Sequence, residues 1–275
     1  MFKISSVLLV NLALCLTLSS QKLMLTNIEE TRTTSGSWDV CYVEVKLIGD
    51  EARNYSFYRI NEITSAVDNK GINLIKEMDR KPEYLPITDN FRIELMKASR
   101  SATDISITGT MTLYKPTEAN GGLVKVPNFR SKPGTNIAPK GSLFSIYFYD
   151  KATLEKRSKI DPNQRRAEID KLSGRERDVA EELEYMVQGL NYYTNDELEN
   201  SVFLIVDGDT KTLVGIEFEG SNGKTIRPMS SYKSNLVHNY YFESKPEAAM
   251  KLVLNIENPK AAKVVPFTLK GIDLP

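Results

Sequence analysis

The residues of this sequence best suited to chemistry are aromatic and basic side chains that could bind a partner. An exposed tyrosine can stack on a sugar or anchor a protein partner, because its ring is flat and apolar while its hydroxyl is polar. Adjacent arginines on a predicted surface insertion add cationic groups where function is often grafted. The candidate binding residues are therefore Tyr192, Tyr193, Tyr240, Tyr241, Arg165 and Arg166.

Both groups of residues also have a simpler interpretation. The tyrosines could belong to an ordinary sheet core and its edges, where aromatic side chains are common. The helical stretch that carries the arginines mixes acidic and basic residues, a pattern typical of a solvated surface. The sequence leaves these alternatives open.

The single histidine argues against catalytic sites that depend on imidazole. Zinc sites without cysteine clusters usually need two or three imidazoles, and this chain has only His238. A Ser-His-Asp arrangement would have to use His238, which lies in a strand-like stretch, and no G-x-S-x-G motif accompanies it. An acidic pair for glycoside hydrolysis stays open, because any two of the 36 acidic residues could converge in the fold. We predict no catalytic residue and lean towards a protein that is not an enzyme.

Two loops resemble ligand-binding motifs only superficially. Residues 220–225 contain Gly-Lys-Thr, but the preceding glycine is too close for a phosphate-binding P-loop, so we predict a hairpin turn. Asp207 and Asp209 could offer oxygen ligands to calcium, but the acidic register of an EF-hand is missing. Turn chemistry explains this segment, and we predict no metal and no cofactor.

Length and composition indicate a globular protein of one or two domains. The chain has 275 residues, 41% of them hydrophobic and 26% charged. The 36 basic residues balance the 36 acidic ones, so no net positive charge attracts nucleic acid. We predict a protein or glycan partner at the cell envelope and no nucleic-acid partner.

The first twenty residues have the layout of a secretory signal peptide. A short positive start at Lys3 precedes a mostly apolar run from Ile4 to Leu18, and small residues follow. Cys15 lies inside this run behind the bulky Leu14, which disfavours lipidation. Removal of residues 1–20 would leave Cys41 as a lone thiol, predicted to be buried and inert. We predict export to the periplasm or cell surface, with no transmembrane anchor in the mature chain.

Short runs rich in β-branched and aromatic residues, separated by turn residues, dominate the first half of the chain. The predicted strands are residues 23–28, 38–47, 55–63, 91–96 and 105–114. Proline and glycine are frequent from residue 115 to residue 140, which suits a connection between domains. We predict an N-terminal immunoglobulin-like β-sandwich domain over residues 21–132.

The second half is predicted to be another β-sandwich domain, residues 133–275, with strands at 142–149, 202–206, 212–218, 248–257 and 264–269. Residues 207–211 are expected to form a hairpin between two of these strands. A helical insertion covers residues 152–190, with helices at 161–172 and 174–189. Asp161 before Pro162 favours the first helix start, and Ser173 with Glu176 fits a capping box for the second.

Residues 66–74 and 265–275 carry two short motifs. The first, AVDNKGINL, is similar to an A-x-D-D-x-G-x-x-L turn-and-strand element, with Asn69 in place of the second aspartate. The second, VPFTLKGIDLP, resembles a V-P-F-x-L-x-x-I-x-L-P ending. Together they resemble exported bacterial proteins of immunoglobulin-like architecture with no assigned activity. The resemblance implies fold and export, and it carries no catalytic residues.

The sequence therefore favours an exported, non-catalytic binding or structural module of the periplasm or cell surface. Two alternatives stay open. One is a hydrolase that acts on polysaccharide or cell wall through an acidic pair, and the other is a calcium-stabilised adhesin-like domain.

Overall fold

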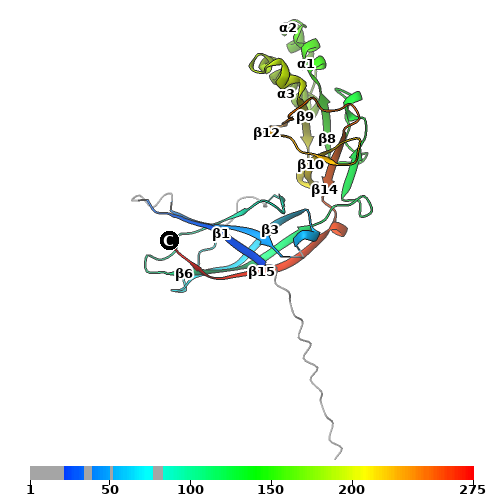
Figure 1. The fold of residues 1–275 in the computed structure, drawn as a ribbon. Coiled ribbons are helices and arrows are strands. Elements are labelled where there is room, and N and C mark those ends of the chain that lie inside the picture. Colours follow the sequence, from blue (N-terminus) through cyan, green and yellow to red (C-terminus); the bar gives the residue numbers. More distant parts are fainter. Residues whose placement is uncertain (1–21, 34–38, 50–51, 77–82) are drawn as a thin grey trace, which may run out of the picture.

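The computed structural model describes residues 22–33, 39–49, 52–76 and 83–275, so the predicted signal peptide lies outside the described residues. The fold is mainly β, as predicted, and its strands form four antiparallel sheets. Figure 1 shows that the elements gather into two groups. Each group contains two of the sheets, and we call the groups the first and second sheet pairs.

The first sheet pair combines strands from both ends of the described chain. One sheet has the order β1-β2-β5, and the other β15-β6-β3-β4. Their bounds are β1 Lys22–Thr31, β2 Val40–Ile48, β3 Phe57–Asp68, β4 Leu85–Pro86, β5 Phe91–Leu95, β6 Asp104–Tyr114 and β15 Ala262–Asp273. Apolar side chains alternate along these strands, so one face of each sheet is buried against the other. Buried residues of both sheets, such as Val43, Met111 and Phe267, form one core.

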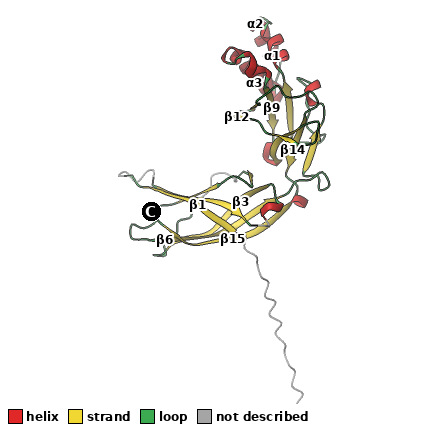
Figure 2. Ribbon diagram, viewed as in Figure 1, coloured by secondary structure: helices red, strands yellow, loops and turns green. Residues whose placement is uncertain are grey.

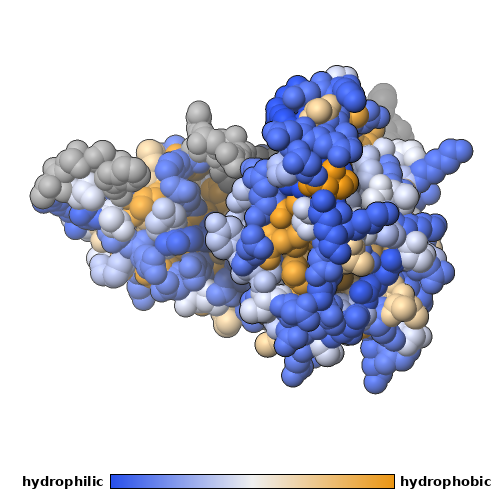
Figure 3. Space-filling view, turned by 90° about the horizontal axis from the view of Figure 1, so that it is seen from above, coloured by the Kyte–Doolittle hydropathy of each residue, from blue (hydrophilic) through white to orange (hydrophobic). Residues whose placement is uncertain are grey.

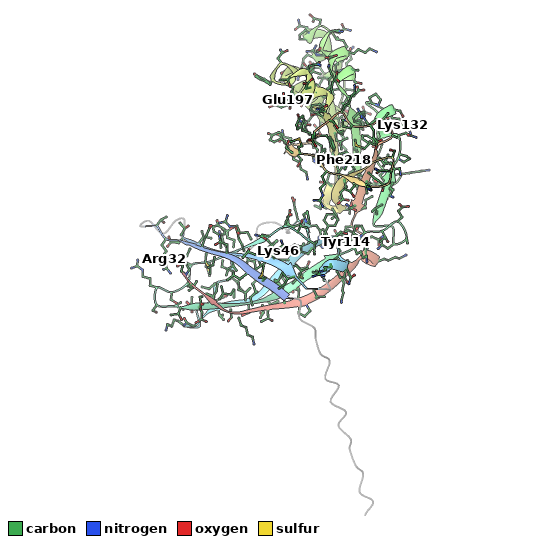
Figure 4. The ribbon with its side chains drawn as sticks, viewed as in Figure 1. Arg32, Lys46, Tyr114, Lys132, Glu197 and Phe218 are labelled. Atoms are coloured by element: carbon green, nitrogen blue, oxygen red, sulfur yellow. The ribbon has the colours of Figure 1, made fainter. Side chains whose placement is uncertain are left out.

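The second sheet pair contains the sheets β11-β10-β14-β7 and β12-β13-β9-β8. Their bounds are β7 Leu123–Val126, β8 Phe144–Tyr149, β9 Ser201–Gly208, β10 Leu213–Glu219, β11 Thr225–Ile226, β12 Ser230–Ser234, β13 Val237–Tyr241 and β14 Lys251–Ile256. Phe148, Phe218 and Leu254 belong to a second buried cluster between these sheets. Figure 4 shows Phe218 inside this group and Tyr114 where the two groups meet.

Helices pack on the outer face of the sheet β12-β13-β9-β8 in the second sheet pair (Figure 2). They are α1 Lys151–Ser158, α2 Pro162–Ile169, α3 Gly174–Gln188 and α4 Asn195–Glu199, with the 3-10 helix η3 Gly189–Tyr192 between the last two. The two predicted helices are confirmed as α2 and α3, and Asp161 caps α2 through hydrogen bonds from the amides of Asn163 and Gln164. The predicted capping box is wrong, because the Ser173 side chain makes no cap hydrogen bond. Gly174 begins that helix with a left-handed φ of 55°, which changes the geometry of its first turn.

Four further 3-10 helices lie in connections: η1 Ala52–Asn54, η2 Phe129–Ser131, η4 Thr210–Thr212 and η5 Pro259–Ala261. The predicted hairpin at residues 207–211 is wrong, because β9 pairs with β8 and β13 whereas β10 pairs with β14 and β11. Gly208 has a φ of 101°, and Asp209 caps η4 by accepting a hydrogen bond from the Lys211 amide. This turn carries the chain to the opposing sheet. The hairpin predicted at residues 220–225 is confirmed by the pairing of β10 with β11.

Sheet membership does not follow the predicted boundary between residues 132 and 133. β7 precedes that boundary but pairs with β14, and β15 returns from the second sheet pair to β6. At the return, the Tyr114 hydroxyl donates to the Ile256 carbonyl, and Arg59 Nη2 lies 2.8 Å from Glu257 Oε1. These contacts join the two groups because they link β6 to the last residue of β14 and β3 to the residue that follows it.

Candidate functional site

The candidate site lies on the outer face of the sheet β12-β13-β9-β8. Its residues alternate between two environments, since Leu204 and Tyr240 point into the core of the second sheet pair while Phe203 and Val237 pack towards the helices. The strand register places Tyr232, Asn239 and Phe203 in one row across β12, β13 and β9. Side chains in such a row are direct neighbours on one face of a sheet.

The helices cover this outer face only in part. α3 packs on β9, and its apolar residues Val179, Met186 and Val187 share a buried cluster with Phe203 and others. Beyond the end of α3, towards β12, a groove of about 420 Å³ remains. Figure 3, seen from the helical end, shows hydrophobic surface between hydrophilic segments on this side of the molecule.

We call this feature the tyrosine groove. Its floor is formed by residues of the sheet and its walls by the helical layer. The lining residues are Leu154, Glu182, Tyr185, Met186, Gln188, Gly189, Leu190, Tyr192, Tyr193, Phe203, Tyr232, Ser234, Val237 and Asn239.

Four tyrosines line the groove and remain open to solvent. The exposed fraction is 90% for Tyr192, 70% for Tyr185, 65% for Tyr232 and 37% for Tyr193. Large aromatic side chains normally bury most of their surface in a fold, so their concentration around one hollow marks a surface suited to contact with a ligand. Tyr193 is also held in place, because its ring meets the Phe203 ring edge-on at 5.7 Å.

Local structure fixes the segment that carries Tyr192 and Tyr193. α3 ends at Gln188 and continues into η3, while α4 begins behind a capping box at Thr194. In that box the Glu197 amide donates to Thr194 Oγ1 at 3.2 Å, and the Thr194 amide donates to Glu197 Oε2 at 2.7 Å. The two tyrosines therefore lie on a short connection anchored at both ends.

The polar groups of the groove are mostly uncharged. Asn239 Oδ1 is buried without a hydrogen-bond partner. Gln188 donates to Glu184 Oε1 at 3.1 Å, which orients its amide. Among the described lining residues, Glu182 is the single charged side chain, and none is Lys, Arg or His.

Of the six residues predicted from the sequence, the structure brings Tyr192 and Tyr193 together in the tyrosine groove. Tyr240 lies in the core of the second sheet pair, where its ring stands 5.0 Å from that of Phe218 and burial raises its pKa. Tyr241 follows it on β13, half-buried and outside the groove lining.

The two arginines have different environments. Arg165 is buried, and its guanidinium holds Glu184 through contacts of 2.8 and 3.0 Å while also donating to the Ile160 carbonyl. Burial opposes ionisation of Glu184, but the hydrogen bonds from Arg165 and Gln188 lower the pKa of its carboxyl. Arg166 is exposed, and its Nη2 lies 3.1 Å from Asp170 Oδ1 in an ion pair on the helix surface. Neither arginine lines the groove.

Sequence reasoning did not select Tyr185, Tyr232 or Asn239. Tyr185 lies within the correctly predicted helix, close before the tyrosine pair, so a search for clustered aromatics could have found it. Tyr232 and Asn239 depend on the pairing of β12 with β13, and no prediction covered the polar strand Ser230–Ser234. Their proximity to the helices follows from tertiary packing, which local sequence does not encode.

His238 and Cys41 both lie in largely buried surroundings. Burial and the charge of Lys233 lower the pKa of His238 to about 4, and its Nδ1 is buried without a partner. Burial also raises the pKa of the Cys41 thiol to about 11, as an inert core cysteine requires. No three His, Cys, Asp or Glu side chains within residues 22–33, 39–49, 52–76 and 83–275 converge as metal ligands would. Over the same residues, no helix is both long and apolar enough to cross a membrane.

No protein-family model, curated protein or solved structure matches this chain.

Proposed function

We propose that this protein is an exported, non-catalytic glycan-binding module of the periplasm or cell surface, and that the tyrosine groove is its ligand site. Export is supported by the signal-peptide layout of residues 1–20. The two sheet pairs, each with a buried cluster of its own, support two immunoglobulin-like β-sandwich domains. The second of these domains carries the helical layer and with it the groove.

The observation that carries the proposal is the set of four exposed tyrosines that line one groove together with Phe203 and Val237. A sugar ring offers an apolar C–H face and a rim of hydroxyls, which match the flat face and the hydroxyl of tyrosine. The groove volume of about 420 Å³ falls in the range of small-ligand sites. A tyrosine side chain has only two torsions, so ordering it on binding costs little conformational entropy.

A hydrolase built on an acidic pair has less support. Only one carboxylate, that of Glu182, lines the groove among the described residues. A second, charged pocket of about 290 Å³ brings together Asp150, Glu155 and Glu199 with three cations. Hydrogen bonds from Lys151 and the charge of Lys245 lower the pKa of Glu199, whereas a general acid needs a raised pKa.

A calcium-stabilised domain also has less support. Asp209 accepts a hydrogen bond from the Lys211 amide as a helix cap, and the Asp207 side chain is buried. The two carboxylates therefore serve different local roles in the turn. A calcium site would instead need several oxygens directed at one point.

The glycan-binding proposal is tested with the mature chain, residues 21–275, on insoluble polysaccharides: cellulose, chitin, xylan, mannan, curdlan and peptidoglycan. We expect retention on at least one of them. Combined substitution of Tyr185, Tyr192 and Tyr232 by alanine should weaken it more than tenfold, because stacking surface at the centre of a site dominates binding. The matched control is Ile72→Ala with Leu143→Ala, which removes exposed apolar side chains outside the groove. Absence of retention on every polysaccharide, or equal loss in the control, would refute the proposal.

Export is tested separately by the N-terminus of the protein recovered from the periplasm of a bacterial host. Cleavage near residues 19–21 is expected, because small residues there follow the apolar run. Recovery only in the cytoplasm, with residue 1 intact, would contradict export while leaving the groove proposal standing.

A further inference from the structure

The charge of the tyrosine groove restricts the kind of glycan that it can hold. Its described lining contains the carboxylate of Glu182 and no cation. Sulfate, phosphate or uronate groups need Arg, Lys or backbone amides to compensate their charge when water is displaced. An anionic glycan would meet no Lys or Arg side chain among the described lining residues and would be repelled by Glu182.

The amide of Asn239 supplies a specific polar contact at the floor of the groove. Asn239 lies between Tyr232 and Phe203 in the same row of the sheet, so aromatic side chains flank it on both neighbouring strands. Its Oδ1 is buried and lacks a hydrogen-bond partner, an arrangement that costs free energy in the unliganded protein. The terminal torsion of asparagine is soft, so rotation of the amide about it can direct this oxygen towards the groove that Asn239 lines.

We infer that the tyrosine groove binds an uncharged glycan, one hydroxyl of which donates a hydrogen bond to Asn239 Oδ1. This inference rests on the proposed function and deepens it. A sugar hydroxyl is both donor and acceptor, so it can satisfy the amide oxygen without bringing a charge. The sugar ring above it lies against the apolar floor at Phe203 and Val237, and adjoining rings stack on the exposed tyrosines.

Asn239 is then a specificity-determining residue, because a buried acceptor rejects a ligand that cannot donate. Aromatic stacking tolerates many sugars, whereas a single buried hydrogen bond discriminates among them. The tyrosines therefore supply affinity and the amide supplies selectivity.

The first experiment needs no variant. Titration calorimetry compares the wild-type mature chain with neutral hexasaccharides (cellohexaose, xylohexaose, mannohexaose, laminarihexaose, chitohexaose) and with anionic ones (hexagalacturonate and a hyaluronan hexamer). We expect at least one neutral hexasaccharide to bind at least tenfold more tightly than either anionic one at low salt. Tighter binding of an anionic hexamer would overturn the inference and leave glycan binding in place.

The second experiment substitutes Asn239→Ala, with Asn163→Ala on the exposed surface of α2 as the matched control. Affinity for the neutral hexasaccharide should fall about tenfold in the first variant and stay unchanged in the second, as expected for one lost hydrogen bond. Thermal unfolding confirms that both variants fold. Unchanged affinity in a folded Asn239→Ala variant, while the triple tyrosine variant loses binding, would overturn the role of Asn239 alone. If no hexasaccharide binds and no polysaccharide retains the protein, the proposed function itself fails.

Discussion

Two central strands, β2 and β9, show how the sheet pairs differ. Along β2 in the first sheet pair, buried and half-buried residues alternate, so one face meets the core and the other meets solvent. Along β9 in the second sheet pair, seven consecutive residues are buried, because one face meets the opposing sheet and the other meets the helices. The tyrosine groove lies where this second cover ends, at β12 and β13.

The comparison shows how an added layer can create a site. A sheet face exposed to solvent carries mostly polar side chains. The outer face of β2 is of this kind, since it carries Glu44 and Lys46, and the Arg92 guanidinium stacks 3.6 Å from the centre of the Tyr42 ring. A sheet face that packs against helices carries apolar side chains. Where the helices cover only part of that face, the apolar side chains at the edge of the cover stay accessible to a ligand.

The largest expected effect concerns the packing of α2 on α3 within the helical layer. Arg165→Met leaves Glu184 as a buried charge without its partner and should lower the unfolding free energy by about 3–5 kcal/mol. The neighbouring Arg166→Met breaks only an exposed ion pair and should cost about 0–1 kcal/mol. Urea unfolding of both variants gives the two values. If the two variants lose similar amounts of unfolding free energy, the Arg165–Glu184 pair does not stabilise the packing of α2 on α3.

The second prediction separates the sheet pairs by their response to acid. His238 has a folded pKa of about 4 and an ordinary value of 6.5, so below pH 6.5 the unfolded chain binds a proton that the folded chain excludes. The second sheet pair should therefore lose up to about 3 kcal/mol of stability as the pH falls from 6.5 to 4. His238→Gln should remove this loss, as measured by urea unfolding of both proteins between pH 6.5 and pH 4. Persistence of the same loss in His238→Gln would assign it to other groups.

The first sheet pair should respond at lower pH. Burial alone would raise the pKa of Asp68, but hydrogen bonds from Ser99 and from the amides of Ile72 and Lys70 lower it to about 2. The stabilisation is fully present above pH 4 and is lost as the pH falls from about 4 to 2, with a size of roughly 2 kcal/mol. Asp68→Asn should show this deficit at pH 7 and lose it near pH 2. A deficit of equal size at both pH values would rule out the titration of Asp68 as its cause.

The smallest expected effect on stability distinguishes the groove from the core. Tyr192→Ala removes a side chain that is 90% exposed, so the unfolding free energy should change by no more than about 0.5 kcal/mol. Phe203→Ala, on the groove floor and buried, should cost about 3–5 kcal/mol. Thermal unfolding of both variants tests this contrast. A large loss in Tyr192→Ala would mean that this tyrosine supports the fold and is not free to bind.

Residues with a strong local pattern made much of this fold predictable. The apolar run at 202–206 indicated a strand, and Asp161 before Pro162 marked a helix start that the structure confirms. The pairing of distant segments was not predictable in the same way. The turn at 207–211 has hairpin composition, yet Gly208 and Asp209 direct the chain to another sheet.

The candidate site was predictable only in part. The pair Tyr192 and Tyr193 stood out as adjacent aromatics in the sequence, and the structure places both at the groove. Arg165 and Arg166 look equivalent in sequence, but one is buried against Glu184 and the other is exposed. Such a difference arises from how α2 packs on α3, which the sequence of α2 alone does not reveal.

The return of β15 to β6 determines the order in which the protein can be completed during translation. All strands of the second sheet pair, β7 to β14, leave the ribosome before β15 does. Until β15 is present, β6 is an edge strand. Its backbone amides and carbonyls along Asp104–Tyr114 lack the hydrogen bonds that β15 later supplies. A chain truncated after residue 261 should therefore already protect the second sheet pair from proteolysis while the first stays susceptible.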